Sequence, residues 1–152
     1  MGHTYTKLWT HLIFSTKNRE QLISPSLEPR LFQFIRDHLF ELESPPRIIN
    51  GMPDHVHILF LQSPAKSLAE IVKNIKGSSS HWINQHDLPH EKFSWQTGYA
   101  AFAVSESQLT KAYEYIANQK EHHLTQDFIA EYNHIIELHG LKMDDDLEKY
   151  TL

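Results

Sequence analysis

The stretch Pro53-Asp54-His55-Val56-His57-Ile58-Leu59-Phe60 decides the fold that we predict for this 152-residue chain. Its β-branched and aromatic residues favour a strand over 55–62, after a turn over 51–54. A shorter strand over 47–50 precedes the turn, so the two segments predict a β-hairpin. Because successive side chains of a strand leave opposite faces, His55 and His57 share one face, whereas Val56 and Ile58 lie on the other.

Helical and extended patterns flank this hairpin in a definite order. Periodicity and composition predict a strand over 4–15, a strand at the end of 93–104, and helices over 27–42, 67–85, 106–123 and 125–138. Capping-box spacing marks two helix starts, at Ser67 with Glu70 and at Ser105 with Gln108. Gly140 closes the last helix. The order β-α-β-β-α-β-α-α predicts an α+β fold: a ferredoxin-like split βαβ antiparallel sheet with helices on one face and added C-terminal helices.

Length and composition indicate one domain over 1–140, followed by an acidic C-terminal tail over 141–152. The chain has no Cys, which excludes disulfides and thiolate metal sites and fits a cytoplasmic location. No apolar run is long enough for a membrane span, and the first residues lack the pattern of a signal peptide, so we expect no membrane partner. The net charge of −5 argues against broad, non-specific binding to duplex DNA.

The paired histidines offer half of a site for a divalent metal ion, because both imidazoles project from one rigid strand. Asp54 would serve as a hydrogen-bond partner for a ligating histidine if the turn bends toward it. Taken alone, the spacing also fits two histidines on an exposed or partly polar sheet face, and it occurs in unrelated zinc hydrolases. The pair therefore needs support from another part of the chain.

That support comes from the helix predicted over 106–123. Leu109, Ala112, Ile116 and Tyr113 form its expected buried stripe, and Tyr115, Gln119 and His122 share the flank of that stripe. A phenol can attack phosphorus when a cation neutralises the phosphate, and an amide oxygen can complete a metal shell with two imidazoles. The other interpretation is a tyrosine at a helix edge with polar neighbours in water.

Five segments in this order resemble the small single-tyrosine HUH transposases of bacterial and archaeal insertion sequences and their REP-associated relatives. Residues 11–19 look like the family's first strand with its basic exit, and residues 52–59 look like its His-hydrophobic-His strand. Residues 71–80 resemble its second helix, 93–105 the segment leading into its last strand, and 115–123 its catalytic helix.

The resemblance implies an activity and a set of site residues. His55, His57 and Gln119 would bind Mg²⁺ or Mn²⁺, and Tyr115 would attack single-stranded DNA to leave a 5′-phosphotyrosine and a free 3′-OH. The family recognises hairpins at element ends and works as a homodimer, in which Tyr115 of one subunit can serve the histidine pair of the other.

Contact with DNA would fall to Lys17, Arg19, Lys73 and Lys76, provided that these four residues gather on one face away from the acidic tail. His81 stands where the resemblance leads us to expect an arginine. We expect His122 and His123 to be structural or to face the DNA rather than to bind the metal.

Three alternatives stay open. A domesticated relative would process chromosomal hairpins with the same chemistry. A non-catalytic ferredoxin-like module would bind nucleic acid without using Tyr115. A His-ligated zinc hydrolase would need a third strong ligand and a nearby general base, for which Asp54 is the local candidate.

Overall fold

The computed structural model describes residues 2–86, 92–124 and 127–140, so the predicted acidic tail over 141–152 lies outside the described residues. The strands are β1 (Trp9–Ser15), β2 (Pro46–Met52), β3 (His55–Leu61) and β4 (Ala100–Val104). The α-helices are α1 (Glu28–Glu41), α2 (Leu68–Gln85), α3 (Leu109–Ala117), α4 (Gln119–His122) and α5 (Phe128–Leu138). Two 3₁₀ turns, η1 (Lys17–Arg19) and η2 (Glu106–Gln108), complete the list.

The four strands form one antiparallel sheet in the order β2-β3-β1-β4, which confirms the predicted ferredoxin-like arrangement. The hairpin is tighter than predicted, because β2 and β3 pair from Met52 and His55 and leave only Pro53 and Asp54 in the turn. β1 begins at Trp9 rather than at residue 4, because both neighbouring strands end opposite Trp9.

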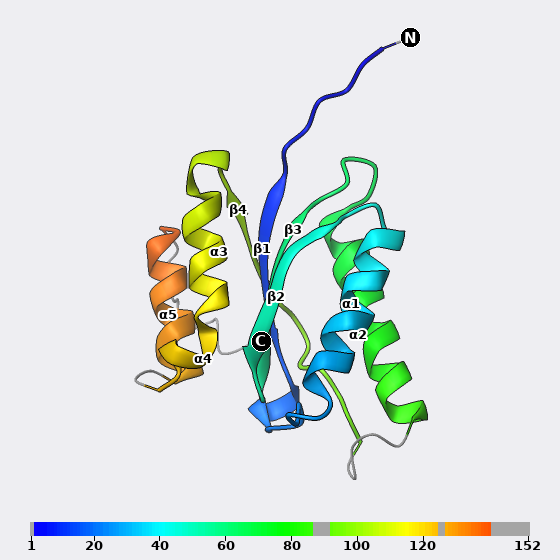
Figure 1. Cartoon of the computed structure of the whole chain (residues 1–152), viewed down its shortest axis with the longest axis vertical. Coiled ribbons are helices and arrows are strands. Elements are labelled where there is room, and N and C mark those ends of the chain that lie inside the picture. The colour runs from blue at the N-terminus through cyan, green and yellow to red at the C-terminus, as the bar shows by residue number, and fades with distance from the viewer. Residues whose placement is uncertain (1, 87–91, 125–126, 141–152) are drawn as a thin grey trace.

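Helices cover both faces of the sheet (Figure 1). As predicted, α1 and α2 pack on one face, where their apolar side chains meet those of Leu12, Phe14, Val56, Ile58 and Phe60. The added helices lie on the opposite face, where α5 packs against Ile13, Ala100 and Phe102. The site residues of β3 face this second layer, because His57 lies in register with Ile13.

The helix predicted over 106–123 is divided into η2, α3 and α4. The break is at Asn118, where ψ is 17°, and the Asn50 amide donates to the carbonyls of Ile116 (2.9 Å) and Ala117 (3.2 Å) at the end of α3. These bonds give the last carbonyls of the helix a partner from β2. The expected buried stripe is also corrected: Ile116 is buried, but Tyr113 is 38% exposed.

The predicted helix ends are confirmed in part. Ser67 accepts a hydrogen bond from the Glu70 backbone N–H, as the spacing predicts. Ser105 does not cap in this way, because its hydroxyl lies 3.1 Å from that of Ser107 and the chain enters a 3₁₀ turn. α5 is capped by Asp127 at its start and followed by Gly140, whose φ is 72°.

Gly51 is required where β2 crosses the start of β3, since a Cβ atom there would collide with the backbone of His55. The close approach brings the end of β2 against the residue that begins the His-x-His strand.

None of the helices in the described ranges combines the length and the apolar character that crossing a bilayer requires.

Candidate metal and tyrosine site

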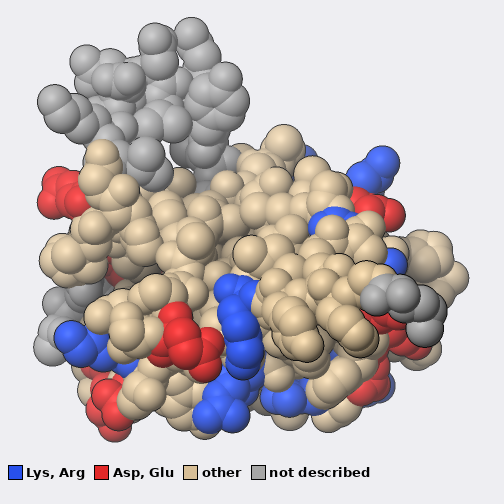
Figure 2. All heavy atoms as spheres, turned by 90° about the horizontal axis from the view of Figure 1, so that it is seen from above, with Lys and Arg blue, Asp and Glu red and all other residues tan. Residues whose placement is uncertain are grey.

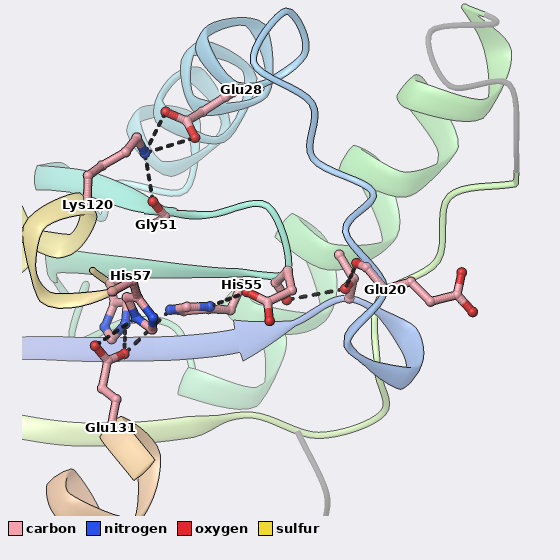
Figure 3. A network of polar contacts seen from close by, with 10 residues as sticks. Glu20, Glu28, Gly51, His55, His57, Lys120 and Glu131 are labelled. Carbon is pink, nitrogen blue, oxygen red and sulfur yellow. Dashed lines mark hydrogen bonds and ion pairs between the residues drawn. The ribbon is translucent and has the colours of Figure 1, made fainter. Parts of the chain in front are cut away.

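His55 and His57 project from the same face of β3, as predicted, and both are completely buried. Their burial rules out the alternative of two histidines on a solvated sheet face. The layer that encloses them consists of α3, α4 and α5, so segments that follow the sheet in sequence close the site (Figure 3).

Glu131 of α5 joins the two histidines, and the sequence analysis did not identify it. Its Oε1 atom lies 2.8 Å from His57 Nε2 and 3.4 Å from His55 Nε2. One ligand atom from each of these three residues lies within 4.8 Å of the others, which is an arrangement suited to a metal ion. A signal was present in the sequence: Glu131 is a charged residue at helical spacing from the buried residues Phe128 and Ile135.

Each member of this triad has a further partner that orients it. His55 Nδ1 lies 2.7 Å from Asp54 Oδ1, so the turn does bend as the sequence analysis required. His57 Nδ1 lies 2.8 Å from Nε2 of His11, and Glu131 Oε2 lies 3.0 Å from Nε2 of His123. Such partners hold the ring and the tautomer of a ligating histidine, leaving the other nitrogen for the metal.

Tyr115 lies beside the triad within the same chain. Its ring centroid is 5.9 Å from that of His57 and 6.2 Å from that of His11. His122, from the expected flank, packs against Tyr115 at 4.8 Å. The structure therefore brings the predicted nucleophile and the histidine pair together without a second subunit.

Gln119 is fully buried, and neither atom of its amide has a hydrogen-bond partner among the described residues. His55 Nε2 likewise forms no hydrogen bond of good geometry there. Buried polar atoms without partners are costly, and they mark places where an ion or another group is expected. The orphaned atoms and the carboxylate of Glu131 therefore fit a divalent cation held by nitrogen and oxygen ligands.

The pKa values of the two histidines on β3 are shifted in opposite directions. Burial lowers the pKa of His57 to about 4, so this imidazole is neutral near pH 7. Burial also disfavours the charged form of His55, but its hydrogen bond to Asp54 and the nearby carboxylate of Glu131 outweigh that effect and raise its pKa. Burial, together with the neighbouring His57, holds the pKa of His11 well below its usual value.

The pKa values of Glu131 and Tyr115 are shifted in opposite directions. Burial opposes ionisation of Glu131, but its close contacts with His55 and His57 hold the pKa of this carboxyl below its usual range. Burial and the negative charge of Glu131 raise the pKa of Tyr115, which the nearby Gln119 only partly counteracts. The site thus carries a buried negative charge that favours a cation, and burial beside that charge keeps the phenol of Tyr115 protonated.

The four basic residues expected at the DNA do not behave alike. The backbone of η1 is tied to residues 94–96, because Lys17 N donates to the Ser94 carbonyl and Asn18 N to Gln96 Oε1. Lys76 reaches the same segment, but its Nζ donates to the carbonyls of Gln96 and Gly98, both at 2.7 Å. The charged group of Lys76 therefore stabilises the fold by binding these two carbonyls.

Lys17, Arg19 and Lys73 keep exposed side chains. On the face seen in Figure 2, Lys and Arg are interspersed with Asp and Glu, and no single sign of charge dominates it. A broad positive surface is therefore not a feature of this face, in keeping with the acidic composition.

Comparison with known proteins gives a consistent result. The family model described as "Transposase IS200 like" matches residues 4–119. The ISDra2 transposase TnpA of Deinococcus radiodurans is 27% identical over 125 residues, which cover 79% of this chain and 89% of that protein.

Two solved structures have similar folds. A crystal structure of a transposase from Deinococcus radiodurans has 30% sequence identity and a TM-score of 0.62, covering 78% of this chain and 96% of that one. A REP-associated tyrosine transposase bound to a REP hairpin has 14% identity and a TM-score of 0.61, covering 81% and 73% of the two chains. At that identity the second likeness concerns the fold alone.

Proposed function

Because the chain belongs to the IS200-like transposase family, we propose that it cuts and rejoins single-stranded DNA through a covalent bond between Tyr115 and a 5′-phosphate. One observation supports this most: Tyr115 lies beside a buried triad of His55, His57 and Glu131, with the unpartnered amide of Gln119 next to it. A tyrosine that only filled space at a helix edge would not require these orphaned polar atoms.

The proposed metal ligands are His55, His57 and Gln119, as the resemblance implies, together with Glu131. Imidazole, amide and carboxylate ligands without a thiolate suit Mg²⁺ or Mn²⁺. When bound, the cation would neutralise charge on the scissile phosphate. The zinc-hydrolase alternative is less well supported, because Asp54, its candidate general base, is engaged with His55 Nδ1.

The reaction that we propose conserves the number of phosphate ester bonds. The Tyr115 oxygen loses its proton and forms a bond to phosphorus, while the bond from phosphorus to the 3′-oxygen breaks and that oxygen takes up a proton. Attack by another 3′-OH reverses the exchange, restores Tyr115 and joins two DNA strands. No external source of energy is needed, because each broken ester is replaced by a new one.

For the DNA partner we propose a hairpin with single-stranded flanks. The REP-associated neighbour, which is described as bound to a REP hairpin, supports this proposal by its fold. Lys17, Arg19 and Lys73 are the cations that we assign to the phosphate backbone, whereas Lys76 is committed to the Gln96 and Gly98 carbonyls. The acidic composition suits recognition of shape better than broad attraction to duplex DNA.

The test is formation of an SDS-stable protein–DNA adduct with hairpin oligonucleotides in Mn²⁺. We expect the adduct with the wild-type chain and none with Tyr115→Phe. Tyr113→Phe is the matched control, since Tyr113 lies on the same helix and is exposed. A normal adduct with Tyr115→Phe would refute the nucleophile assignment. Tight hairpin binding without any adduct would favour the non-catalytic module.

The family resemblance also proposes a homodimer with shared sites, and a mixing experiment addresses it. A Tyr115→Phe chain combined with a His57→Ala chain would regain cleavage if the tyrosine of one subunit serves the histidines of the other. The arrangement within one chain predicts the opposite, namely no regain, because Tyr115 already lies beside its own His57.

A further inference from the structure

A cavity of about 630 Å³ adjoins Tyr115 and has no part in the metal triad. It lies where the end of β4, the start of α3 and the end of α5 come together (Figure 1). His11 and Tyr115 form its boundary with the site, and residues of α3 and α5 line its other walls. A cavity of this size falls in the range of small-molecule sites, about 300 to 1,000 Å³.

We propose that this cavity binds one unstacked nucleotide of the DNA strand, next to the phosphate that Tyr115 attacks. The inference rests on the proposed function, because it places the scissile phosphate at Tyr115. The nucleotide on either side of that phosphate is covalently attached to it. One of these two nucleotides must therefore lie within a single nucleotide's length of Tyr115, which is where the cavity begins.

The lining has the chemistry that an unpaired nucleotide requires. Ala112, Ile135 and Leu138 offer an apolar surface to the faces of a base, and the side chain of Leu138 is 70% exposed. Gln108 and His134 offer hydrogen-bonding groups to the edge of a base. Lys111 supplies the cation for a flanking phosphate.

Enclosure of a base also explains how an acidic chain can hold DNA at a chosen position. The formal net charge is −5, so attraction to the phosphate backbone is a weak source of affinity for the chain as a whole. Contact between a base and the walls of the cavity adds affinity that does not depend on the net charge of the chain. A base paired within a duplex cannot enter such a cavity, so the cavity selects a single-stranded flank.

The first experiment fills the cavity. Ala112→Phe places an aromatic ring in it, and Thr110→Phe is the matched control on the exposed side of α3, outside the lining. Affinities for a fluorescently labelled hairpin with single-stranded flanks are measured in EDTA, so that no cleavage interferes. We expect about tenfold weaker binding by Ala112→Phe, because the base loses its place in the cavity, and less than a twofold change for the control.

A single abasic nucleotide is then moved along the flanks. Wild type should lose about tenfold in affinity at one position adjacent to the cleavage site, and Ala112→Phe should lose nothing further there. If Ala112→Phe is as sensitive to that abasic position as wild type, the base lies elsewhere and the inference is overturned. Lys111→Gln, with Lys66→Gln as the control for charge, provides a second variant should Ala112→Phe fold poorly. It should weaken binding and reduce the salt dependence.

Crosslinking of the wild-type chain needs no variant. With 5-iododeoxyuridine at the sensitive position, crosslinks should fall on α3 or on residues 134–139. Crosslinks confined to other parts of the chain would overturn the inference. Adduct formation is measured separately. Absence of the adduct in wild type would contradict the proposed function. An adduct that forms equally well with Ala112→Phe and with the abasic nucleotide would contradict only the proposal that the cavity binds a nucleotide.

Discussion

Glu131 Oε1 lies 2.8 Å from His57 Nε2, and this contact joins α5 to β3 across 74 residues of sequence. The same carboxylate meets His55 and His123, so one buried negative charge connects three imidazoles. Burial and the charge of Glu131 raise the pKa of Tyr115, so the carboxylate that would attract a cation also keeps the proposed nucleophile protonated when no cation is bound. The charge of Glu131 therefore affects both the candidate metal site and the protonation of Tyr115.

Glu131→Gln should weaken Mn²⁺ binding by at least about tenfold, since it removes the charge while retaining the shape of the side chain. Isothermal titration calorimetry with Mn²⁺ measures the effect directly. Glu137→Gln, on the exposed side of the same helix, is the control and should bind Mn²⁺ like the wild type. An unchanged affinity in Glu131→Gln would show that this carboxylate is not a ligand.

Gln119→Met should stabilise the metal-free protein and abolish its stabilisation by Mn²⁺. The amide is buried without partners, so a side chain of similar volume that lacks polar atoms should add about 1 kcal/mol to the free energy of unfolding. Thermal unfolding with and without Mn²⁺ reports both effects, with Gln85→Met as the exposed control. A variant that Mn²⁺ stabilises as much as wild type would remove Gln119 from the proposed ligands.

His11→Ala should reduce the affinity for Mn²⁺ by about 10- to 100-fold, although His11 is not a proposed ligand. Its Nε2 lies 2.8 Å from His57 Nδ1 and can hold that ring with its other nitrogen toward the metal. Calorimetry again provides the measurement, and His81→Ala, exposed on α2, provides the control. If Mn²⁺ binds equally well to His11→Ala, the contact between the two rings has no role in positioning His57.

Asn50→Ala should loosen the segment that carries Tyr115 and Gln119. The Asn50 amide donates to the last carbonyls of α3, and its loss should lower the free energy of unfolding by about 1 kcal/mol. Amide hydrogen exchange over residues 109–122 should become faster, and adduct formation slower. Asn74→Ala, on the exposed surface of α2, is the comparison. Unaltered exchange over 109–122 would mean that Asn50 does not hold this segment.

Lys76→Met should change how stability depends on pH. Burial lowers the pKa of Lys76 to about 8 in the folded chain, whereas the unfolded chain retains the usual value of 10.5. Between these values the unfolded state holds a proton that the folded state has lost, so stability from this group rises with pH across that window. Urea unfolding from pH 7 to 10.5 should show this rise in wild type and in Lys73→Met, but not in Lys76→Met. The same rise in all three proteins would contradict the assignment.

The fold was predictable from local patterns. Strand composition over 55–62 identifies a strand, helical spacing over 27–42 and 67–85 specifies the apolar face of each helix, and the order of elements then restricts the topology. The hairpin, the ferredoxin-like sheet and the family resemblance all follow from these patterns. The break at Asn118 could not be predicted in the same way, because it depends on Asn50, a residue of another strand.

The residues of the candidate site also fall into two groups: those that local spacing predicted and those that only distant contacts reveal. His55 and His57 were found because a strand places residues i and i+2 together, and Tyr115 and Gln119 because a helix places residues i and i+4 together. Glu131 and His11 were missed, since their contacts with His57 cross 74 and 46 residues and have no local spacing. Lys76 was predicted to contact DNA only because it is positively charged. The structure shows instead that its Nζ binds the Gln96 and Gly98 carbonyls.

By itself, the sequence determined that β3 is a strand, that His55 and His57 share one of its faces, and that Tyr115 lies on a helix. Each of these features depends on backbone geometry over a few residues. The tertiary structure alone decided that the pair is buried rather than solvated, that a carboxylate from α5 completes the triad, and that a cavity opens beside Tyr115. These features depend on how the C-terminal helices pack over the sheet, and packing is determined by many weak contacts between distant segments rather than by any local pattern.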